Sequence, residues 1–379
     1  MDVRALLIVN PHATSTTQVR RDVIVHALAS ELDLEVVQTR YRGHASSVAE
    51  AAARDGYGLV LTMGGDGTVN EAVNGLLRAY PPDGPGRPAR AAGRPATTGT
   101  AWPAIGRQRT ATAAEQPTGD HQGPAAGPPS VRGPGAPVRA APLPAALPGA
   151  PVAGTPLFAP VPGGNANVFT RALGLPADPV DATGRILAAL SAGRTRMVGL
   201  GRADGRYFCF NAGLGLDAEV VRVVEGLRAR GQTVSAALYV WTAVRQFYSV
   251  TNRHEPALTL ERDGCPAMDA LFLGIVSNTS PWTYLGQRPV NASPRAGFDT
   301  GLDLFALRKL STLRTLSVLR QMLSRDGGPA GRYVVSLHDQ DALTFRAARP
   351  VAFQVDGEYV GEREQVILHS IPNALRVLV

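Results

Sequence analysis

The chain has 379 residues, of which 44% are hydrophobic and 18% are charged. This composition excludes a protein that is disordered throughout, and the length suggests two or three domains. The formal net charge is +7, a mild basic excess that suits anionic lipids, nucleotides or nucleic acid and selects none of them.

Cysteine and lysine usage limits which cellular compartment and which phosphate-binding mechanism can be expected. Cys209 and Cys265 form neither a CxxC pair nor a zinc-ligand pattern, so we expect a reducing compartment and no zinc. The N-terminal residues have no apolar stretch typical of a signal peptide, and no run approaches the length of a transmembrane helix. We therefore expect a cytoplasmic protein whose membrane contact is peripheral. Lys309 is the single lysine, which excludes a mechanism that needs a lysine in a phosphate loop.

The N-terminal part alternates between the two kinds of secondary structure. Apolar runs predict strands over residues 4–9, 34–37 and 58–62, and helical spacing predicts helices over residues 18–32, 45–54 and 69–77. Such alternation indicates an α/β unit with a parallel sheet.

Residues 81–155 interrupt this pattern. Proline, glycine, alanine and arginine dominate them without any periodicity, so the segment is predicted to be a disordered insertion. The α/β pattern then resumes with a strand over residues 157–161 and a helix over residues 166–173.

Strand-like runs dominate after about residue 196, and they predict an antiparallel sandwich or barrel. The expected strands cover residues 197–200, 206–211, 257–262, 270–277, 302–307, 333–338, 342–346, 351–355 and 365–369. Two helices are expected among them, over residues 218–249 and 311–324. Within the first, the aromatic-rich stretch 234–250 could line a lipid cleft or lie on a membrane, but packing on the sandwich is the favoured interpretation.

The strongest local signal is GGDGTVNE, residues 64–71, which follows a predicted strand and opens a helix. Ligands of parallel sheets bind beyond the carboxyl ends of the strands, and glycines let backbone amides approach phosphate oxygens. The helix N-terminus adds unpaired amides and a positive partial charge. Phosphate would repel Asp66 unless this residue holds magnesium or accepts a proton from an acceptor hydroxyl. The alternative is an ordinary glycine-rich turn with an aspartate cap.

Two further loops follow predicted strands. The turn PGGNAN, residues 162–167, could face the same nucleotide as GGDG, or it could be a helix cap made by Asn165 or Asn167. The loop NPHATS, residues 10–15, could bind phosphate although it lacks the glycines and the lysine of a Walker A loop. A plain turn with a solvated His12 is the alternative.

Three acidic turns lie further along the chain. FQVDGE, residues 353–358, places two carboxylates around a glycine, and composition alone favours a hairpin turn there. FDTGLD, residues 298–303, could be a hairpin or a metal site built from Asp299 and backbone carbonyls. NAGLGLD, residues 211–217, could end in a helix cap made by Asp217.

The order of these motifs is itself informative. An Asn-Pro pair after the first strand is followed by GGDGTVNE, PGGNANVFTRALGLP, NAGLGLDAEVV, FDTGLDLFAL and FQVDGE. This ordered set resembles the diacylglycerol kinase catalytic family, which includes bacterial lipid kinases and, more distantly, sphingosine kinases. GGDG alone is shared with NAD kinases and loosely with phosphofructokinases, whereas the later motifs distinguish the lipid kinases. The resemblance covers the chain apart from residues 81–155.

The resemblance implies a two-domain fold. Residues 1–80 and 156–176 would form a Rossmann-like nucleotide domain similar to those of NAD kinase and phosphofructokinase. Residues 177–370 would form an antiparallel β-sandwich that binds the lipid, with a cleft between the two domains. Residues 371–379 would form a strand that returns to the first domain.

The resemblance also implies the site residues. Glu358 would be the proton acceptor with Asp356 beside it, and Asp66 is the other candidate for this role. A magnesium ion would lie near Ala296, Asp299 and Gly301. The residues expected to bind ATP are Asn10, Pro11, His12, Ala13, Thr14, Thr39, Gly64, Gly65, Asp66, Gly67, Thr68, Val69, Asn70 and Asn165. The chain departs from the family at Asn165, where many members have threonine, and in NPHATS, which lacks a common glycine.

The implied reaction is ATP- and Mg²⁺-dependent transfer of a phosphoryl group to a lipid hydroxyl, with diacylglycerol as the default acceptor and phospholipid biosynthesis as the context. The expected partner is a lipid at a membrane surface, without nucleic acid, and a homodimer is usual for the family. The alternatives are a soluble small-molecule kinase similar to NAD kinase and a non-catalytic nucleotide- or lipid-binding regulator with the same fold.

Overall fold

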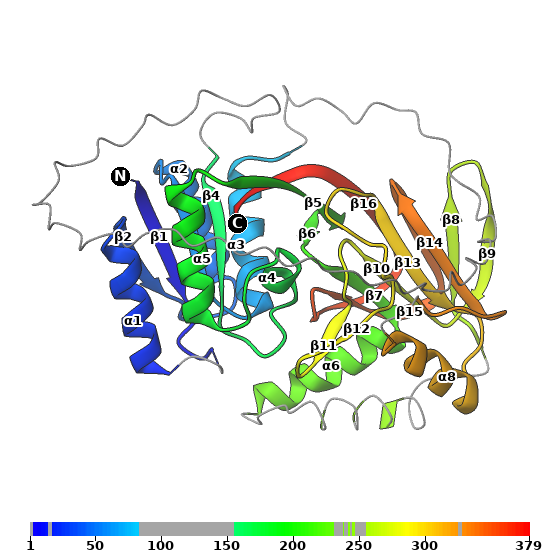
Figure 1. Ribbon diagram of the computed structural model, residues 1–379. Helices are drawn as coiled ribbons and strands as arrows, with labels where there is room; N and C mark the ends of the chain where they lie inside the picture. The colour runs from blue at the N-terminus through cyan, green and yellow to red at the C-terminus, as the bar shows by residue number, and fades with distance from the viewer. Residues whose placement is uncertain are drawn as a thin grey trace, which may run out of the picture. The chain divides into compact units, whose positions relative to one another are not determined.

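The computed structural model describes residues 3–13, 17–82, 155–230, 255–324 and 328–379, together with residues 238, 242, 245 and 246. These residues belong to one unit of the chain, in which an N-terminal lobe and a C-terminal lobe share a mixed sheet (Figure 1). Thr14, nearly all of the predicted insertion 81–155 and most of the stretch 234–250 lie outside the described residues.

The N-terminal lobe is an α/β layer. Its strands lie in the order β4-β3-β1-β2, and all of them are parallel. β1 and β3 are buried along almost their whole length because helices cover both faces of the sheet. The elements are β1 (Arg4–Val9), α1 (Gln18–Ala29), β2 (Asp33–Gln38), α2 (His44–Arg54), β3 (Leu59–Gly64), α3 (Asp66–Ala79), β4 (Leu157–Pro162), α4 (Val168–Ala172) and α5 (Pro179–Ser191).

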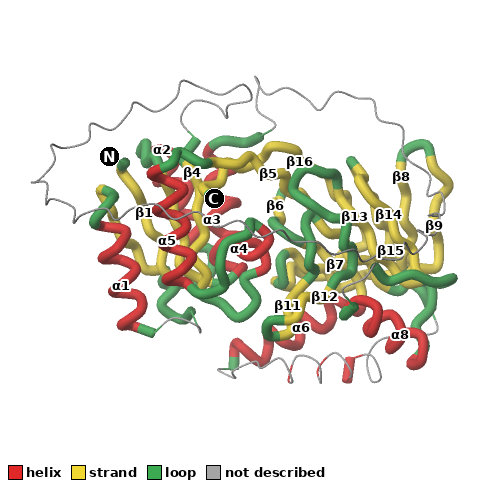
Figure 2. Tube along the Cα trace, in the orientation of Figure 1, coloured by secondary structure: helices red, strands yellow, loops and turns green. Residues whose placement is uncertain are grey.

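The C-terminal lobe consists mainly of antiparallel strands, which Figure 2 distinguishes from the helices. A separate hydrophobic cluster fills it, with Phe208, Phe345 and Phe353 among its largest members. The elements are β5 (Thr195–Ala203), β6 (Arg206–Phe208), β7 (Asn211–Gly215), α6 (Leu216–Ala229), β8 (Leu258–Arg262), β9 (Cys265–Leu271), β10 (Leu273–Ser277), β11 (Thr283–Leu285), β12 (Arg288–Val290), β13 (Leu302–Leu307), α8 (Thr312–Met322), β14 (Val334–Gln340), β15 (Ala342–Val355) and β16 (Glu358–Leu378).

β16 connects the two lobes. Its first half pairs with β15, and its second half pairs with β5. Near its end Val377 lies beside Phe158 of β4, so the antiparallel strands of one lobe continue into the parallel sheet of the other. The predicted fold class, a parallel α/β part joined to an antiparallel part, is confirmed.

The structure differs from several predicted boundaries. The first helix ends at Ala29. The helix expected over residues 69–77 begins earlier, at Asp66, so Asp66 and Gly67 of GGDG lie in its first turn. The predicted strand 206–211 is divided into β6 and β7. The runs 342–346 and 351–355 form the single strand β15, and residues 365–369 and 375–379 both belong to β16.

The segment after residue 177 also differs from its predicted place in the sandwich. Asp178 caps the unpredicted helix α5, with Pro179 in its first turn. Ile186 and Ala189 of α5 pack into the core of the N-terminal lobe. Among the described residues, no helix is long and apolar enough to span a bilayer.

The close approach of α2 to α3 gives the first testable prediction. A methyl group added at Gly75 of α3 would overlap the carbonyl oxygen of Ser46 in α2. We expect Gly75→Ala to lower the free energy of unfolding by about 1–3 kcal/mol. Gly184→Ala in α5 is the matched control because an added methyl there meets no atom within 4 Å, and it should be neutral or stabilising by up to about 1 kcal/mol. Urea unfolding measures both, and equal effects would contradict this packing.

Candidate active site

The turn between β3 and α3 is built for close backbone approach. β3 ends at Gly64, and Gly65 is the residue that precedes the helix. A methyl at Gly64 would lie 2.6 Å from Oγ1 of Thr68, so only glycine fits above this hydroxyl. The Thr68 Oγ1 accepts a hydrogen bond of 3.2 Å from Nδ2 of Asn10, which follows β1. The first and third strands therefore end in one connected group of loops.

The second glycine turn packs against the first. The Gly163 amide donates to the Gly64 carbonyl at 2.8 Å. A methyl at Gly164 would lie only 2.7 Å from the Cα of Gly65, and one at Gly163 would lie 3.2 Å from the Cβ of Ala13. Three loops at the carboxyl edge of the parallel sheet thus meet with almost no side chains between them, which leaves backbone amides near one point.

The remaining residues expected to bind ATP have different surroundings. His12 and Asn165 are exposed at this edge, and Thr39 follows β2, where its amide donates to the Val9 carbonyl at 2.8 Å. Val69 is buried in the core of the N-terminal lobe. The side chain of Asn70 is buried on the face of α3 that points to the other lobe.

The Asp66 carboxylate contacts the start of α4. Its Oδ1 accepts a hydrogen bond of 3.2 Å from the Phe169 amide. Burial raises the pKa of Asp66 to about 6, while hydrogen bonds from the backbone of Val168, Phe169 and Asn167 act in the opposite direction. Asp66 therefore acts here as a cap that links α3 to α4. Its carboxylate is already engaged by amides, rather than free to hold a metal ion.

Asp356 lies buried where the two lobes meet. Its carboxylate accepts hydrogen bonds from the amides of Cys209 at 2.6 Å, Phe210 at 2.9 Å and Asn211 at 3.1 Å. A fourth hydrogen bond, of 2.7 Å, comes from Nδ2 of Asn70 in α3. Burial raises the pKa of Asp356 despite these four donors. Asp356 thus links the two lobes. Its carboxylate is buried and bound by four donors, which leaves it poorly placed to accept a proton from a substrate.

The turn at Asp356 is also a hairpin. Asp356 and Gly357 have φ values of 48° and 75°, which are the positive values that a two-residue type I′ turn requires. The hairpin interpretation of FQVDGE and its functional interpretation are therefore compatible, because the turn itself presents Glu358.

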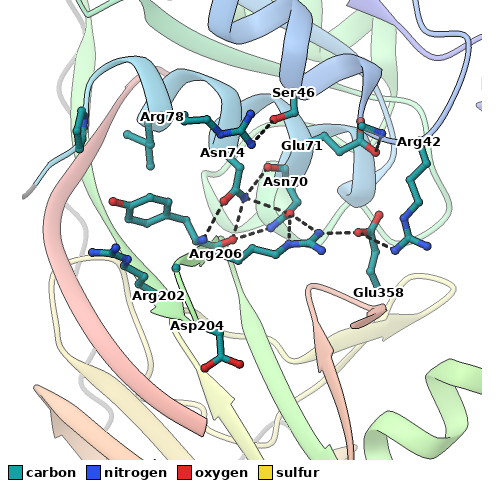
Figure 3. A pocket seen from close by; sticks show the side chains of 15 residues that line it. Arg42, Ser46, Asn70, Glu71, Asn74, Arg78, Arg202, Asp204, Arg206 and Glu358 are labelled. Carbon is teal, nitrogen blue, oxygen red and sulfur yellow. Dashed lines mark hydrogen bonds and ion pairs between the residues drawn. The ribbon is translucent and has the colours of Figure 1, made fainter. Parts of the chain in front are cut away.

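Glu358 faces the first turn of α3. A methyl at Gly67 would lie 2.7 Å from Oε1 of Glu358, so the carboxylate directly contacts the GGDG segment. Its Oε2 accepts a hydrogen bond of 2.5 Å from Nη2 of Arg206 and one of 3.3 Å from Nη2 of Arg42. Figure 3 shows Arg206 between Asn70 and Glu358 (Figure 3).

A cleft of about 620 Å³ extends from Glu358 along α3. Its wall includes four arginines, Arg42, Arg78, Arg202 and Arg206. Its acidic members besides Glu358 are engaged in the structure. Glu71 accepts from amides at the start of α2, and Asp204 pairs with Arg363 at 2.9 Å. An anionic group of a ligand entering the cleft would therefore meet arginines around Glu358.

The residues expected to hold magnesium do not fit a resident cation in this arrangement. Asp299 is 74% exposed and pairs with Arg196 at 2.6 Å. The Gly301 carbonyl accepts from the Thr300 hydroxyl at 3.2 Å. Within the described ranges, no group of three or more His, Cys, Asp or Glu side chains is placed to share a metal ion. One exposed carboxylate held by arginine falls short of the oxygen shell that Mg²⁺ or Ca²⁺ requires.

Sequence patterns did not identify several residues of the cleft. Arg42, in the loop before α2, and Arg206, the first residue of β6, belong to no motif, because arginines in such places have many ordinary roles. The position of Asn74 could have been predicted from its spacing in the sequence. It lies one helical turn after Asn70 and so shares its face of α3, and its side chain donates to the Tyr207 carbonyl at 3.0 Å.

Comparisons with known proteins agree with this arrangement. Residues 4–92 match the family model described as the diacylglycerol kinase catalytic domain. Among curated proteins, none matches the chain significantly. Of solved structures, a diacylglycerol kinase from Bacillus anthracis str. Sterne has a TM-score of 0.59 at 16% identity, with 99% of this chain and 96% of that chain covered.

Two other solved structures resemble the chain to different degrees. A "putative diacylglycerol kinase" from Bacillus anthracis str. Sterne has a TM-score of 0.62 at 18% identity, with 99% of this chain and 97% of that chain covered. An NAD kinase from Archaeoglobus fulgidus in complex with ATP reaches a TM-score of only 0.45 at 9% identity, with 99% and 93% covered, which is too low to support an argument.

The fold of the chain is similar to that of these diacylglycerol kinase structures, and its N-terminal segment matches the catalytic-domain model. The match to the diacylglycerol kinase catalytic domain over residues 4–92 supports the resemblance that the order of the motifs predicted.

A second buried carboxyl beside the site gives a pH-dependent prediction. Asp217 accepts a hydrogen bond of 2.8 Å from Nε2 of Gln354. Burial raises its pKa from 3.8 to about 6, although that hydrogen bond opposes the shift. Because the folded state binds this proton more tightly than the unfolded state, Asp217 favours folding at low pH, and its contribution is lost as the pH rises through about 6.

We therefore expect the free energy of unfolding to fall more in the wild type than in Asp217→Asn between pH 4 and pH 7, by up to about 3 kcal/mol. Urea unfolding across this range measures the difference. Asp263→Asn, in the exposed turn between β8 and β9, is the control and should keep the wild-type slope. An Asp217→Asn variant with that same slope would refute the assignment.

Proposed function

We propose that this protein is an ATP-dependent lipid kinase that transfers the γ-phosphoryl group of ATP to the hydroxyl of a diacylglycerol-like lipid. The observation that carries the proposal is the contact between Glu358 and the first turn of α3 at Gly67. A carboxylate that can accept a proton thereby faces the loop that is suited to hold a triphosphate. Phosphoryl transfer requires this pairing of a phosphate site and an acceptor for the hydroxyl proton.

The phosphate side of the reaction relies on backbone groups. The N-terminal amides of α3 at the first glycine turn, residues 64–67, offer hydrogen-bond donors. The amides of Gly163 and Gly164 already donate to the Gly64 carbonyl and to Oδ1 of Asn167, so the second turn supports the first. A helix N-terminus also provides positive partial charge for phosphate oxygens. In this proposal the loops after β1, β2, β3 and β4 together bind ATP, with Asn10, Thr39 and Asn165 beside the phosphates or the nucleoside.

The acceptor side relies on Glu358. Its Oε1 faces Gly67, whereas its Oε2 is occupied by Arg206 and Arg42. Oε1 would accept the proton of the lipid hydroxyl as the oxygen attacks the γ-phosphorus. Asp66 is the weaker candidate because its Oδ1 is turned toward the amides of α4. Asp356 is weaker still because four donors already surround its carboxylate.

Charge neutralisation would come from the arginines and from the nucleotide's own cation. Arg206 and Arg42 both donate to Glu358 from the cleft wall, and in this proposal they would pair with the incoming phosphate. Mg²⁺ bound to ATP would neutralise phosphate charge and orient the γ-phosphate. We further propose that the reaction takes place in the cytoplasm at a membrane surface, where a lipid acceptor is found.

A direct assay tests this function. Purified protein with labelled ATP and Mg²⁺ should phosphorylate short-chain diacylglycerol in mixed micelles, with the product identified by mass spectrometry. We expect Glu358→Gln to lower the single-turnover rate by about 10²–10⁴-fold because an amide cannot accept the hydroxyl proton. Asp66→Asn should lose much less, since its amide oxygen can still cap α4.

The matched control is Glu362→Gln, four residues further along β16, where the glutamate pairs with Arg222 at 3.3 Å and does not line the cleft. It should turn over at the wild-type rate. Phosphorylation of NAD instead of lipid would establish the soluble-kinase alternative, and an absence of ATP consumption with every lipid tested would support a non-catalytic regulator. A near-native rate for Glu358→Gln would remove Glu358 as the base.

Arg206 is the next residue to test. It donates to Asn70 Oδ1 from Nε at 3.1 Å and from Nη2 at 2.6 Å, while also holding Glu358. We expect Arg206→Gln to lower kcat about ten- to a hundredfold because Glu358 loses the partner that positions it. Lysine should rescue this only partly, since it lacks the guanidinium fork.

The readout must separate positioning from folding. Arg206→Gln should change kcat more than the KM for ATP, at a melting temperature close to that of the wild type. Arg222→Gln removes an arginine of comparable exposure outside the cleft and should leave both constants unchanged. A loss of thermal stability with normal kcat would reduce Arg206 to a structural role.

A further inference from the structure

Helix α8 presents leucines to solvent. Its inner side chains Val318 and Met322 are buried in a cluster with Phe305 of β13. On its outer side, Leu313 is 82% exposed, Leu316 57% and Leu319 42%. Within the described part of the chain, every leucine among the exposed large hydrophobic residues lies on this one helix. Such clustering differs from the scattered apolar residues of an ordinary surface.

The same segment has a single sign of charge. Residues 304–325 contain no aspartate or glutamate and five basic residues, Arg308, Lys309, Arg314, Arg320 and Arg325. The formal net charge of the whole chain is only +7, so this short segment accounts for much of the basic excess. The positive charge noted from composition is therefore concentrated beside the exposed leucines.

Three cations gather around one aromatic ring at the base of α8. Arg314 lies 4.4 Å from the centroid of the Tyr333 ring, Arg332 lies at 5.6 Å and the Lys309 ammonium at 5.7 Å. None of these three cations pairs with a carboxylate among the residues that the structure describes. Cations held by a ring face rather than by acids remain available to an external anion.

We propose that α8 and the basic cluster at Tyr333, made of Lys309, Arg314 and Arg332, form a docking surface for an anionic lipid bilayer. The leucines would enter the boundary between head groups and acyl chains, and the arginines and Lys309 would contact the negative head groups, as in interfacial amphipathic helices. A groove on another protein would need acidic residues opposite Lys309, Arg314 and Arg332, which gather at Tyr333. A bilayer provides apolar depth and diffuse negative charge together.

This surface is coupled to the lobe that carries the candidate base. Leu216, at the start of α6, packs against the same hydrophobic cluster as α8, and α6 in turn contacts β15 and β16, which flank the Glu358 turn. Figure 1 draws α6 and α8 along the same edge of the C-terminal lobe. The docking proposal goes beyond the kinase proposal, because binding to vesicles requires neither ATP nor turnover.

The test is cosedimentation of the full-length chain with vesicles, without nucleotide. Wild type should bind vesicles of phosphatidylcholine mixed with phosphatidylglycerol, bind pure phosphatidylcholine vesicles weakly, and lose affinity at high salt. Leu313→Ser/Leu316→Ser should lower the partition coefficient at least about tenfold. Arg314→Gln/Arg320→Gln should lower it roughly thirtyfold on anionic vesicles.

The matched control is Val19→Ser/Val23→Ser, which removes two apolar side chains that are 72% and 51% exposed on α1. It should bind as the wild type does. All variants should melt near the wild-type temperature and phosphorylate a monomeric short-chain lipid equally, so a failed kinase assay and a failed docking assay can be told apart.

Three results would overturn the proposal. The first is wild-type binding by both α8 variants, and the second is an absence of wild-type binding to anionic vesicles. The third is a dimer, seen by sedimentation velocity, that the leucine variant converts to monomer while vesicle binding is unchanged. That last outcome would assign α8 to an interface between two copies of the chain.

Discussion

The position of the Asp356 carboxylate governs the rest of the site. A carboxylate taken out of water loses solvation that costs several kcal/mol unless donors replace it. Here three successive amides, of residues 209–211, and Nδ2 of Asn70 replace that solvation. The amides belong to the C-terminal lobe and Asn70 belongs to α3, so the four bonds form together only when α3 is in register with the 356–357 turn. Glu358, two residues later, is thereby placed against Gly67.

The same interaction explains why β6 and β7 are separate strands. The sequence of residues 206–211 is apolar and predicts one strand, but the amides of Cys209, Phe210 and Asn211 turn toward Asp356 instead of a neighbouring strand. No local pattern could have shown this, because the acceptor lies about 145 positions further along the chain. A tertiary hydrogen bond here outweighs strand propensity.

What the sequence could predict depended on whether the signal was local. The α/β order, the strand-glycine-helix turns and the Asp-Gly hairpin follow from neighbouring residues, and the structure contains them. β16 could not be predicted as one strand because Pro372 and Asn373 read as a break. Its continuity comes from pairing with β5, whose register shifts between Ile371 and Leu375 to accommodate that stretch. Helix α5 carries local signals, Asp178 and Pro179, whereas the family resemblance implies that all of residues 177–370 belong to the sandwich.

The candidate site also combines features that the sequence could predict with features that only the folded chain creates. Loops at the carboxyl edge of a parallel sheet meet because of topology, so their convergence was predictable from strand order. Asp66 was interpreted from its own turn alone, as a metal ligand or a base, and the competing demand came from the unpaired amides of α4, about a hundred residues away. Arg206 and Arg42 could not be chosen from the many arginines of the chain, because only the fold brings them to Glu358.

If Glu358 is the proton acceptor, its ion pairs with Arg206 and Arg42 have a consequence for the reaction. Arg206 and Arg42 already bind Oε2, so an arginine that pairs with the transferred phosphate would give up part of its interaction with Glu358. Both guanidinium groups line the cleft and bind Oε2 of Glu358, which leaves Oε1 toward Gly67.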